Sequence, residues 1–181
     1  MNILITGGLG HIGSFLLDNF QIKKKINFYI VDNLLTERYC TLFNLKKKIN
    51  CEFFKLDVSK DDISKIVKKS DLILHLAAIT NAEGSFKIKD KVFKNNFQST
   101  KKIADLCAKF NKPIILFSST SVYGPIKRYQ FIDENVPYNQ LKPQSPYAEC
   151  KIKEEKYLLI LKNKKLKFVI LRLGTIFGIS P

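Results

Sequence analysis

A tyrosine and a lysine four residues apart carry the clearest chemistry in this sequence. Tyr147 and Lys151 open a stretch, residues 146–161, whose apolar residues recur at helical spacing. On a helix, this spacing puts both side chains on one face. The lysine ammonium then favours the phenolate, and we expect the pKa of the phenol to fall from about 10 towards neutrality. Tyr147 would become a general base. The alternative is an exposed helical pair, because the spacing arises by chance in lysine-rich chains.

A glycine-rich turn near the N-terminus predicts a dinucleotide site. The strand-like residues 2–6 run into Gly7, Gly10 and Gly13, and a helix-like stretch follows. Gly7 allows a tight turn, Gly10 lets the backbone approach a pyrophosphate, and Gly13 lets helix and strand pack closely. The N-terminus of the helix adds N–H donors and the positive end of its dipole. The glycines indicate a dinucleotide site because they lie between a predicted strand and a predicted helix.

Two acidic residues lie at the carboxyl ends of predicted strands. Asp32 comes nineteen residues after Gly13, at the end of the second strand. A carboxylate there accepts hydrogen bonds from an adenosine ribose and repels a 2′-phosphate, which favours NAD over NADP. Asp57 ends the third strand in the same way, where the adenine would lie. Each could instead start a turn or cap a helix.

A serine-rich segment, residues 118–124, completes the chemistry. It follows the fifth predicted strand and leads towards the helix of Tyr147. A serine hydroxyl at that strand end would hydrogen-bond a substrate hydroxyl, Tyr147 would remove its proton, and the hydride of the same carbon would pass to the nicotinamide. The product is a transient ketone. Because a dinucleotide loop and a serine-rich strand end precede Tyr147 and Lys151 in the chain, the catalytic interpretation of this pair is favoured over that of an exposed helical pair.

Short apolar runs alternate with helical patterns along the whole chain. The predicted strands are residues 2–6, 27–31, 51–56, 71–76, 113–118 and 167–171. The predicted helices are residues 12–20, 61–69, 91–110 and 146–161, with a weaker helical pattern over residues 42–48. Such alternation predicts an α/β fold with six or more parallel strands and helices on both faces. Right-handed crossovers then give a doubly wound sheet, the NAD(P)-binding Rossmann fold, in strand order 3-2-1-4-5-6.

Composition narrows the class of protein. The 181 residues suffice for one domain, and the formal charge is +15. Lysines come in short runs at expected turns and helix ends (residues 23–25, 46–48 and 162–165) without interleaved aromatic residues, so we expect no dedicated nucleic-acid site. No apolar run is long enough to cross a membrane and no basic leader precedes the first strand, which predicts a soluble, cytoplasmic protein. The four cysteines are scattered, so we expect neither disulfides nor a metal site.

With these residues in view, the chain resembles the extended short-chain dehydrogenase/reductase family. Within it, the resemblance is to the NAD-dependent epimerase/dehydratase group, whose type members are UDP-glucose 4-epimerases. It implies a catalytic set of Ser119, Tyr147 as base and Lys151, which would also bind the nicotinamide ribose. The cofactor-binding residues that the glycine loop and the resemblance together indicate are Gly7, Gly10, His11, Ile12, Gly13, Asp32, Asn33, Asp57, Val58, Leu76, Ala77, Ala78, Thr80, Asn95, Ser118, Tyr147, Lys151 and Gly174.

Departures from the family pattern shape the expected reaction. Thr120 and Ser121 stand where the dehydratases of the family typically carry an Asp-Glu pair, which favours epimerisation, or simple oxidoreduction, of a nucleotide sugar over dehydration. Gly174 and Thr175 stand where typical epimerases carry a Phe-Asn pair, so the resemblance does not identify the sugar of the substrate. Family members usually continue into a smaller substrate-binding domain, so we expect residues 1–181 to be the cofactor domain with the catalytic residues. The resemblance also implies a homodimer formed by the helices beside Tyr147.

Overall fold

A parallel sheet forms the centre of the molecule. The computed structural model of the chain describes residues 1–20, 26–45, 49–125, 131–163 and 165–178. The strands are β1 (Asn2–Thr6), β2 (Asn27–Asp32), β3 (Asn50–Lys55), β4 (Leu72–His75), β5 (Ile114–Ser119) and β6 (Phe168–Leu173). They pair in the order β3-β2-β1-β4-β5-β6, and every pairing is parallel. The predicted Rossmann topology is confirmed.

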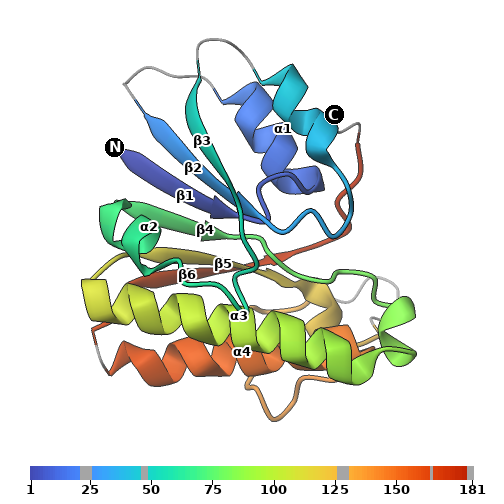
Figure 1. Cartoon of the computed structure of the whole chain (residues 1–181). Coiled ribbons are helices and arrows are strands. Elements are labelled where there is room, and N and C mark those ends of the chain that lie inside the picture. The colour runs from blue at the N-terminus through green and yellow to red at the C-terminus, as the bar shows by residue number, and fades with distance from the viewer. Residues whose placement is uncertain (21–25, 46–48, 126–130, 164, 179–181) are drawn as a thin grey trace.

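Helices cover both faces of this sheet (Figure 1). The α-helices are α1 (His11–Asn19), α2 (Ser64–Lys69), α3 (Lys89–Phe110) and α4 (Pro146–Lys162), and the 3-10 helices are η1 (Tyr39–Asn44), η2 (Gly84–Phe86) and η3 (Thr120–Val122). Helix α1 packs on one face, whereas α2, α3 and α4 pack on the other, with α3 running alongside α4.

Alternating side chains of the strands divide the core into two clusters. In β1, Leu4 belongs to the cluster beneath α2, α3 and α4, whereas Ile3 and Ile5 join the cluster beneath α1. All three are at most 5% exposed. Burial on both faces explains why the central strands are apolar throughout instead of alternating with polar residues.

The outer strand β6 departs from this two-sided burial. Phe168 and Ile170 pack against the cluster beneath α4, but Val169 and Leu171 point to the opposite face and are 51% and 38% exposed. Among the described residues, no helix covers that part of the α1 face (Figure 1).

Two predicted helical segments have different bounds in the structure. Helix α2 begins at Ser64 instead of residue 61, because Asp61 accepts a hydrogen bond from the Asp57 backbone N–H at 2.7 Å and closes a turn before the helix. The weak helical pattern over residues 42–48 corresponds to η1, which begins at Tyr39 and ends at Asn44; residues 46–48 lie outside the described residues.

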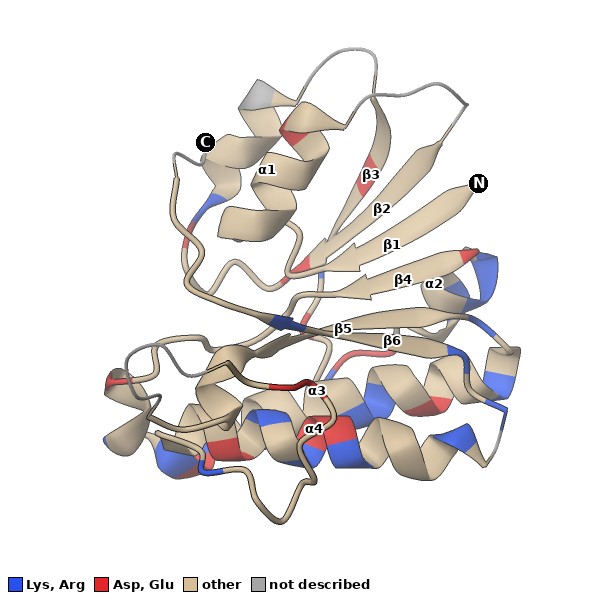
Figure 2. Ribbon diagram, turned by 180° about the vertical axis from the view of Figure 1, so that it is seen from behind, with Lys and Arg blue, Asp and Glu red and all other residues tan. Residues whose placement is uncertain are grey.

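Many of the basic side chains of the described residues lie on the helices of one face of the sheet (Figure 2). Figure 2 shows Lys and Arg along α2, α3 and α4 with acidic residues among them. Of the predicted lysine runs, residues 23–25 and 46–48 and residue 164 lie outside the described part of the chain. Within that part, no helix is long and apolar enough to span a bilayer, and no three His, Cys, Asp or Glu side chains gather as a metal site would require.

A buried histidine links three elements of the core. His75, at the end of β4, is 2% exposed; its Nδ1 lies 2.7 Å from the Thr6 hydroxyl of β1 and its Nε2 lies 3.0 Å from the Thr100 hydroxyl of α3. Burial, with a smaller effect of the nearby Lys151 charge, lowers the pKa of His75 to about 3. The imidazole is therefore neutral in the folded protein.

This neutral histidine makes the free energy of unfolding depend on pH. Because the folded-state pKa is about 3 and the ordinary value is 6.5, the unfolded chain binds a proton first as the pH falls. The stabilisation is fully present above pH 6.5 and declines below it by about 1.4 kcal/mol per pH unit. Urea unfolding between pH 7 and 5 should show a shallower decline for His75→Gln than for the parent protein. Equal slopes would contradict the prediction.

Candidate functional site

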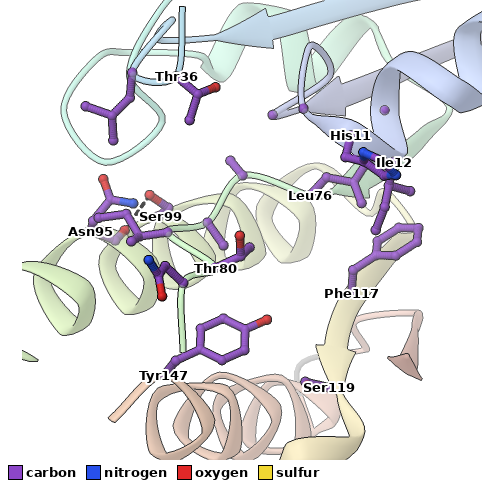
Figure 3. A pocket seen from close by; sticks show the side chains of 18 of the residues that line it. His11, Ile12, Thr36, Leu76, Thr80, Asn95, Ser99, Phe117, Ser119 and Tyr147 are labelled. Carbon is purple, nitrogen blue, oxygen red and sulfur yellow. Dashed lines mark hydrogen bonds between the residues drawn. The ribbon is translucent and has the colours of Figure 1, made fainter. Parts of the chain in front are cut away.

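An elongated cavity of about 790 Å³ runs along the carboxyl ends of the strands, between the glycine loop and α4. Figure 3 shows part of its lining. His11 and Ile12 lie at the glycine loop, Thr36 lies away from them along the cavity, and Tyr147 and Ser119 lie across the cavity from Thr36. Every residue that the sequence predicted for the site lines this one cavity. The structure thus brings together segments from residue 7 to residue 174.

The glycine loop makes close backbone contacts that leave no room for side chains at two of its glycines. Gly7 has φ +68°, and a Cβ there would lie 2.7 Å from the backbone of Ala77. A Cβ on Gly13 would lie 2.5 Å from the carbonyl oxygen of Gly8, so α1 packs closely against the turn that follows β1. Gly10 lines the cavity, and helix α1 begins immediately after it without a side-chain cap. The N-terminus of α1 therefore faces the cavity and suits an anionic group.

Asp32 has a second task besides lining the cavity. Its carboxylate accepts hydrogen bonds from the backbone N–H of Leu9 at 3.1 Å and of Leu34 at 2.9 Å. These bonds tie the glycine loop to the turn after β2, where Leu34 adopts a positive φ of 59°. The turn interpretation and the ribose interpretation of Asp32 are compatible, because the side chain also reaches the cavity.

Asp57 likewise combines the two interpretations. Its carboxylate accepts hydrogen bonds from the backbone N–H of Ser59 at 2.9 Å and from the Ser59 hydroxyl at 2.6 Å. The amide of Asn33 approaches the other oxygen at 3.5 Å. The residue caps the turn before α2 and, beside Val58, forms part of the cavity wall.

The middle of the cavity is held by an asparagine to which the sequence prediction assigned no role. Asn96 is fully buried in α3, and its side-chain amide exchanges two hydrogen bonds with the backbone of Ile79, at 2.8 and 3.0 Å. This pair fixes the segment of Ala77, Ala78 and Thr80 against the cavity. The sequence signal for Asn96 was a polar side chain at a helical position that faces the core. This signal does not identify Ile79 as the hydrogen-bond partner. Its neighbour Asn95 lines the cavity.

Local capping fixes Tyr147 at the beginning of α4. The Ser145 hydroxyl accepts a hydrogen bond from the N–H of Ala148 at 3.2 Å, and Pro146 occupies the first turn, as is favoured at helix N-termini. The backbone N–H of Tyr147 donates to the Ser85 hydroxyl of η2 at 3.3 Å. The phenol thereby projects into the cavity (Figure 3).

Ser119 reaches the same end of the cavity from β5. Its hydroxyl lies 2.8 Å from that of Ser121 and accepts a hydrogen bond from the Ser121 backbone N–H at 3.2 Å. The neighbouring Ser118 also lines the cavity, but its buried hydroxyl donates to Glu155 on α4. Ser119 lines the same cavity and lies at the end of β5, on the same side of the cavity as Tyr147 (Figure 3).

The expected fall in the pKa of Tyr147 was wrong. Burial raises the pKa of the phenol above 10; Lys151 opposes this, and Glu154 reinforces it. The Lys151 ammonium lies 5.8 Å from the centre of the Tyr147 ring and makes its close contact with Glu154, at 2.8 Å. Burial alone would lower the pKa of Lys151, but Glu154 and Tyr147 outweigh burial and raise it. Lys151 is therefore a cation in the folded protein.

A buried ion pair anchors α4 to the last two strands. Arg172 of β6 binds the fully buried Glu155 through Nη2 at 2.6 Å and through Nε at 3.1 Å. Glu155 also accepts hydrogen bonds from Ser118 and, at 2.7 Å, from the Tyr138 hydroxyl. This network holds the helix of Tyr147 at a fixed position relative to the strand of Ser119.

Several lining residues were missing from the sequence prediction. Those beside the Asp32 end are Leu35, Thr36 and Arg38, and those nearer Tyr147 include Ser99, Phe117, Ser121 and Ile176. Ser99 lies on α3, Phe117 on β5 and Ser121 on η3, whereas the others lie on loops. No spacing rule connects these residues to the motifs.

The fold and the cavity together define a Rossmann-type dinucleotide-binding domain with a Tyr/Lys pair at one end. A family model described as "NAD dependent epimerase/dehydratase family" matches residues 3–180. The chain belongs to this family, whose cofactor is NAD.

Individual relatives differ in their reactions. The chain is 32% identical to a dTDP-D-glucose 4,6-dehydratase of Dictyostelium discoideum over 97% of its own length and 44% of the relative's. It is 28% identical to a UDP-glucose 4-epimerase of Streptococcus mutans over its full length and 54% of the relative's. The crystal structure of UDP-glucuronic acid 4-epimerase from Bacillus cereus with UDP-glucuronic acid and NAD is similar with a TM-score of 0.85 at 27% identity, covering 95% of this chain and 56% of that one. The chain spans about half the length of these relatives.

Proposed function

We propose that residues 1–181 form the NAD-binding domain of a nucleotide-sugar 4-epimerase and carry its catalytic residues. The observation that carries this proposal is one cavity with an anion-binding glycine loop at one end and Ser119, Tyr147 and Lys151 at the other. The α1 N-terminus would hold the pyrophosphate and Asp32 the adenosine ribose. Lys151 would hold the nicotinamide ribose.

The catalytic end suits removal and return of a proton. NAD, when bound, accepts a hydride from the sugar carbon and returns it. Tyr147 takes the proton of the sugar hydroxyl and later gives it back, while Ser119 hydrogen-bonds the same oxygen. Lys151, a cation in the folded protein, opposes the effect of burial, which raises the pKa of the phenol. Inversion of the carbon would require the hydride to return to the other face of the ketone.

The surroundings of Ser119 favour epimerisation over water elimination. A smaller cavity of about 360 Å³ adjoins the catalytic end and is lined by Ser119, Thr120, Ser121, Gly124, Gln144, Gly174 and Thr175. Neutral hydroxyl and amide groups make up its polar lining. Elimination of water needs an acid and a base beside the leaving hydroxyl, and no carboxylate is present among these described residues.

The reaction can be tested with the purified protein and a panel of UDP- and dTDP-linked sugars. We expect interconversion of two sugars that differ at carbon 4, without net production or consumption of NADH. Steady accumulation of NADH would contradict the proposal and show an oxidoreductase. A 4-keto-6-deoxy product would contradict it and show a dehydratase.

Selection of NAD over NADP should depend on Asp32. We expect Asp32→Ala to weaken NAD binding by roughly tenfold to a hundredfold, because a charged hydrogen bond to the ribose is lost. Binding of NADP should weaken less, because the charge that repels its 2′-phosphate is also removed. Calorimetric titrations of both cofactors measure this, with Asp32→Asn as the variant that keeps acceptor capacity for the loop. Unchanged NAD affinity in a folded Asp32→Ala protein would exclude the ribose role.

We also propose that the protein is a homodimer through the outer surface of α3 and α4. This surface exposes Phe93, Leu159 and Ile160, of which Ile160 is 62% exposed. Sedimentation velocity should show a dimer for the parent protein and a monomer for Ile160→Glu, because a carboxylate would be buried in the contact. The control Phe43→Glu, an equivalent change on the exposed surface of η1, should remain a dimer. A monomeric parent protein would contradict the proposal.

A further inference from the structure

A fully buried carboxylate lies one helical turn beyond the catalytic lysine. Glu154 is 0% exposed, and its Oε2 lies 2.8 Å from the Nζ of Lys151, whose side chain is 4% exposed. The other oxygen, Oε1, accepts a hydrogen bond from the Cys150 thiol at 3.4 Å. Both oxygens are thus engaged on α4 itself, next to Lys151, which lines the cavity.

Glu154 differs from its neighbour Glu155 in what it touches. Glu155 binds Arg172, Ser118 and Tyr138 and joins α4 to the sheet. Glu154 instead contacts the residue that supplies positive charge to the catalytic end. Within the described residues, the titratable groups around this pair are Tyr147 and Cys150 on α4 and His75 on β4, and His75 is neutral.

The geometry has an electrostatic consequence for Tyr147. A lysine ammonium alone would strongly favour the phenolate in a buried site. A carboxylate 2.8 Å from that ammonium cancels much of its field, so the phenol experiences a weak dipole instead of a full positive charge. The same contact holds the ammonium 5.8 Å from the centre of the Tyr147 ring.

We propose that Glu154 is a positioning residue that fixes the Lys151 ammonium at the catalytic end of the cavity and, by offsetting its charge, sets the pH at which Tyr147 becomes a base. The inference rests on the proposed role of Tyr147 in the reaction. It predicts that the phenol of this protein ionises at a higher pH than the Tyr147 and Lys151 pair alone would give. The pH range in which the enzyme works would then depend on Glu154 of α4, a residue that does not touch the substrate.

The ionisation of Tyr147 can be measured without turnover. Phenolate absorbance is titrated in the near ultraviolet for each protein and for its Tyr147→Phe counterpart, and the difference isolates one of the seven tyrosines. Glu154→Gln should move the midpoint down by roughly one pH unit, since it removes a charge at short range and preserves the shape. The control Glu149→Gln removes an acid from the exposed side of the same helix, paired with Lys89 at 3.3 Å, and should not move it.

A structural role alone would give a different pattern. In that case Glu154→Gln would lower the melting temperature and leave the midpoint unchanged, which overturns the proposal, as does a midpoint that rises. The conservative variant Glu154→Asp should keep the midpoint near that of the parent protein.

A second variant covers the case in which Glu154→Gln does not fold. Lys151→Met/Glu154→Gln removes both buried charges together, a change that folded proteins tolerate better than loss of one partner. If the two charges offset each other, its midpoint stays close to that of the parent; a large upward shift would show that Lys151 acts unopposed and would reject the inference. These titrations are independent of sugar turnover, so failure of the epimerase proposal would be recognised separately.

Discussion

Tyr147→Phe should lower the rate of sugar interconversion by about a hundredfold to ten-thousandfold, the usual contribution of a positioned general base. The change removes only the hydroxyl, while the ring, which is packed between the start of α4 and the cavity, remains. NAD affinity should stay within about fivefold of the parent value, because one neutral hydrogen bond contributes roughly 1 kcal/mol. The effect is therefore expected in kcat.

Steady-state kinetics and calorimetry on the same preparation separate these effects. The control is Tyr157→Phe, on the same helix, whose hydroxyl donates to Asp105 at 2.6 Å on the surface of α3. It should retain the parent rate. A Tyr147→Phe protein that retains at least a tenth of the parent kcat would remove Tyr147 from the reaction and leave the cavity as a cofactor site alone.

Loss of Glu155 should have the largest effect on stability. Glu155→Leu leaves the guanidinium of Arg172, whose side chain is 10% exposed, without its partner, and also strands the hydroxyls of Ser118 and Tyr138. Breaking a buried ion pair from one side costs about 3 to 5 kcal/mol. We expect the free energy of unfolding, from urea titration, to fall by that amount.

A double-mutant cycle tests the physical reason. Because replacement of both charges by apolar side chains removes the uncompensated cation, Glu155→Leu/Arg172→Leu should be more stable than Glu155→Leu alone. Additive losses would mean that Arg172 remains solvated without Glu155, contrary to its two close contacts with that carboxylate.

Sequence patterns predicted the elements of this protein because their causes are local or periodic. Buried parallel strands are apolar on both faces, and the six predicted strands all appear within one or two residues of their observed ends. The strand order followed from chain connectivity, since right-handed crossovers leave few arrangements. Helix starts were less certain: Asp57 and Asp61 form a turn that competes with the first turn of α2, and this competition depends on two side chains finding each other.

The sequence by itself determined the ends of the site. The glycine turn, Asp32 after the second strand, and the Tyr147 and Lys151 spacing are each explained by local geometry, and parallel strands bring their carboxyl ends to one edge. The roles of individual residues at that edge stay predictions until variants are measured.

Only the tertiary structure decided the electrostatics and the supports. Asn96 clamps Ile79 across 17 residues of sequence, and Arg172 finds Glu155 from another element. Burial and Glu154 reverse the shift that Lys151 alone would impose on Tyr147. These effects depend on desolvation and on distances between groups that no local pattern encodes, because the field at a buried atom is summed over everything that folding places around it.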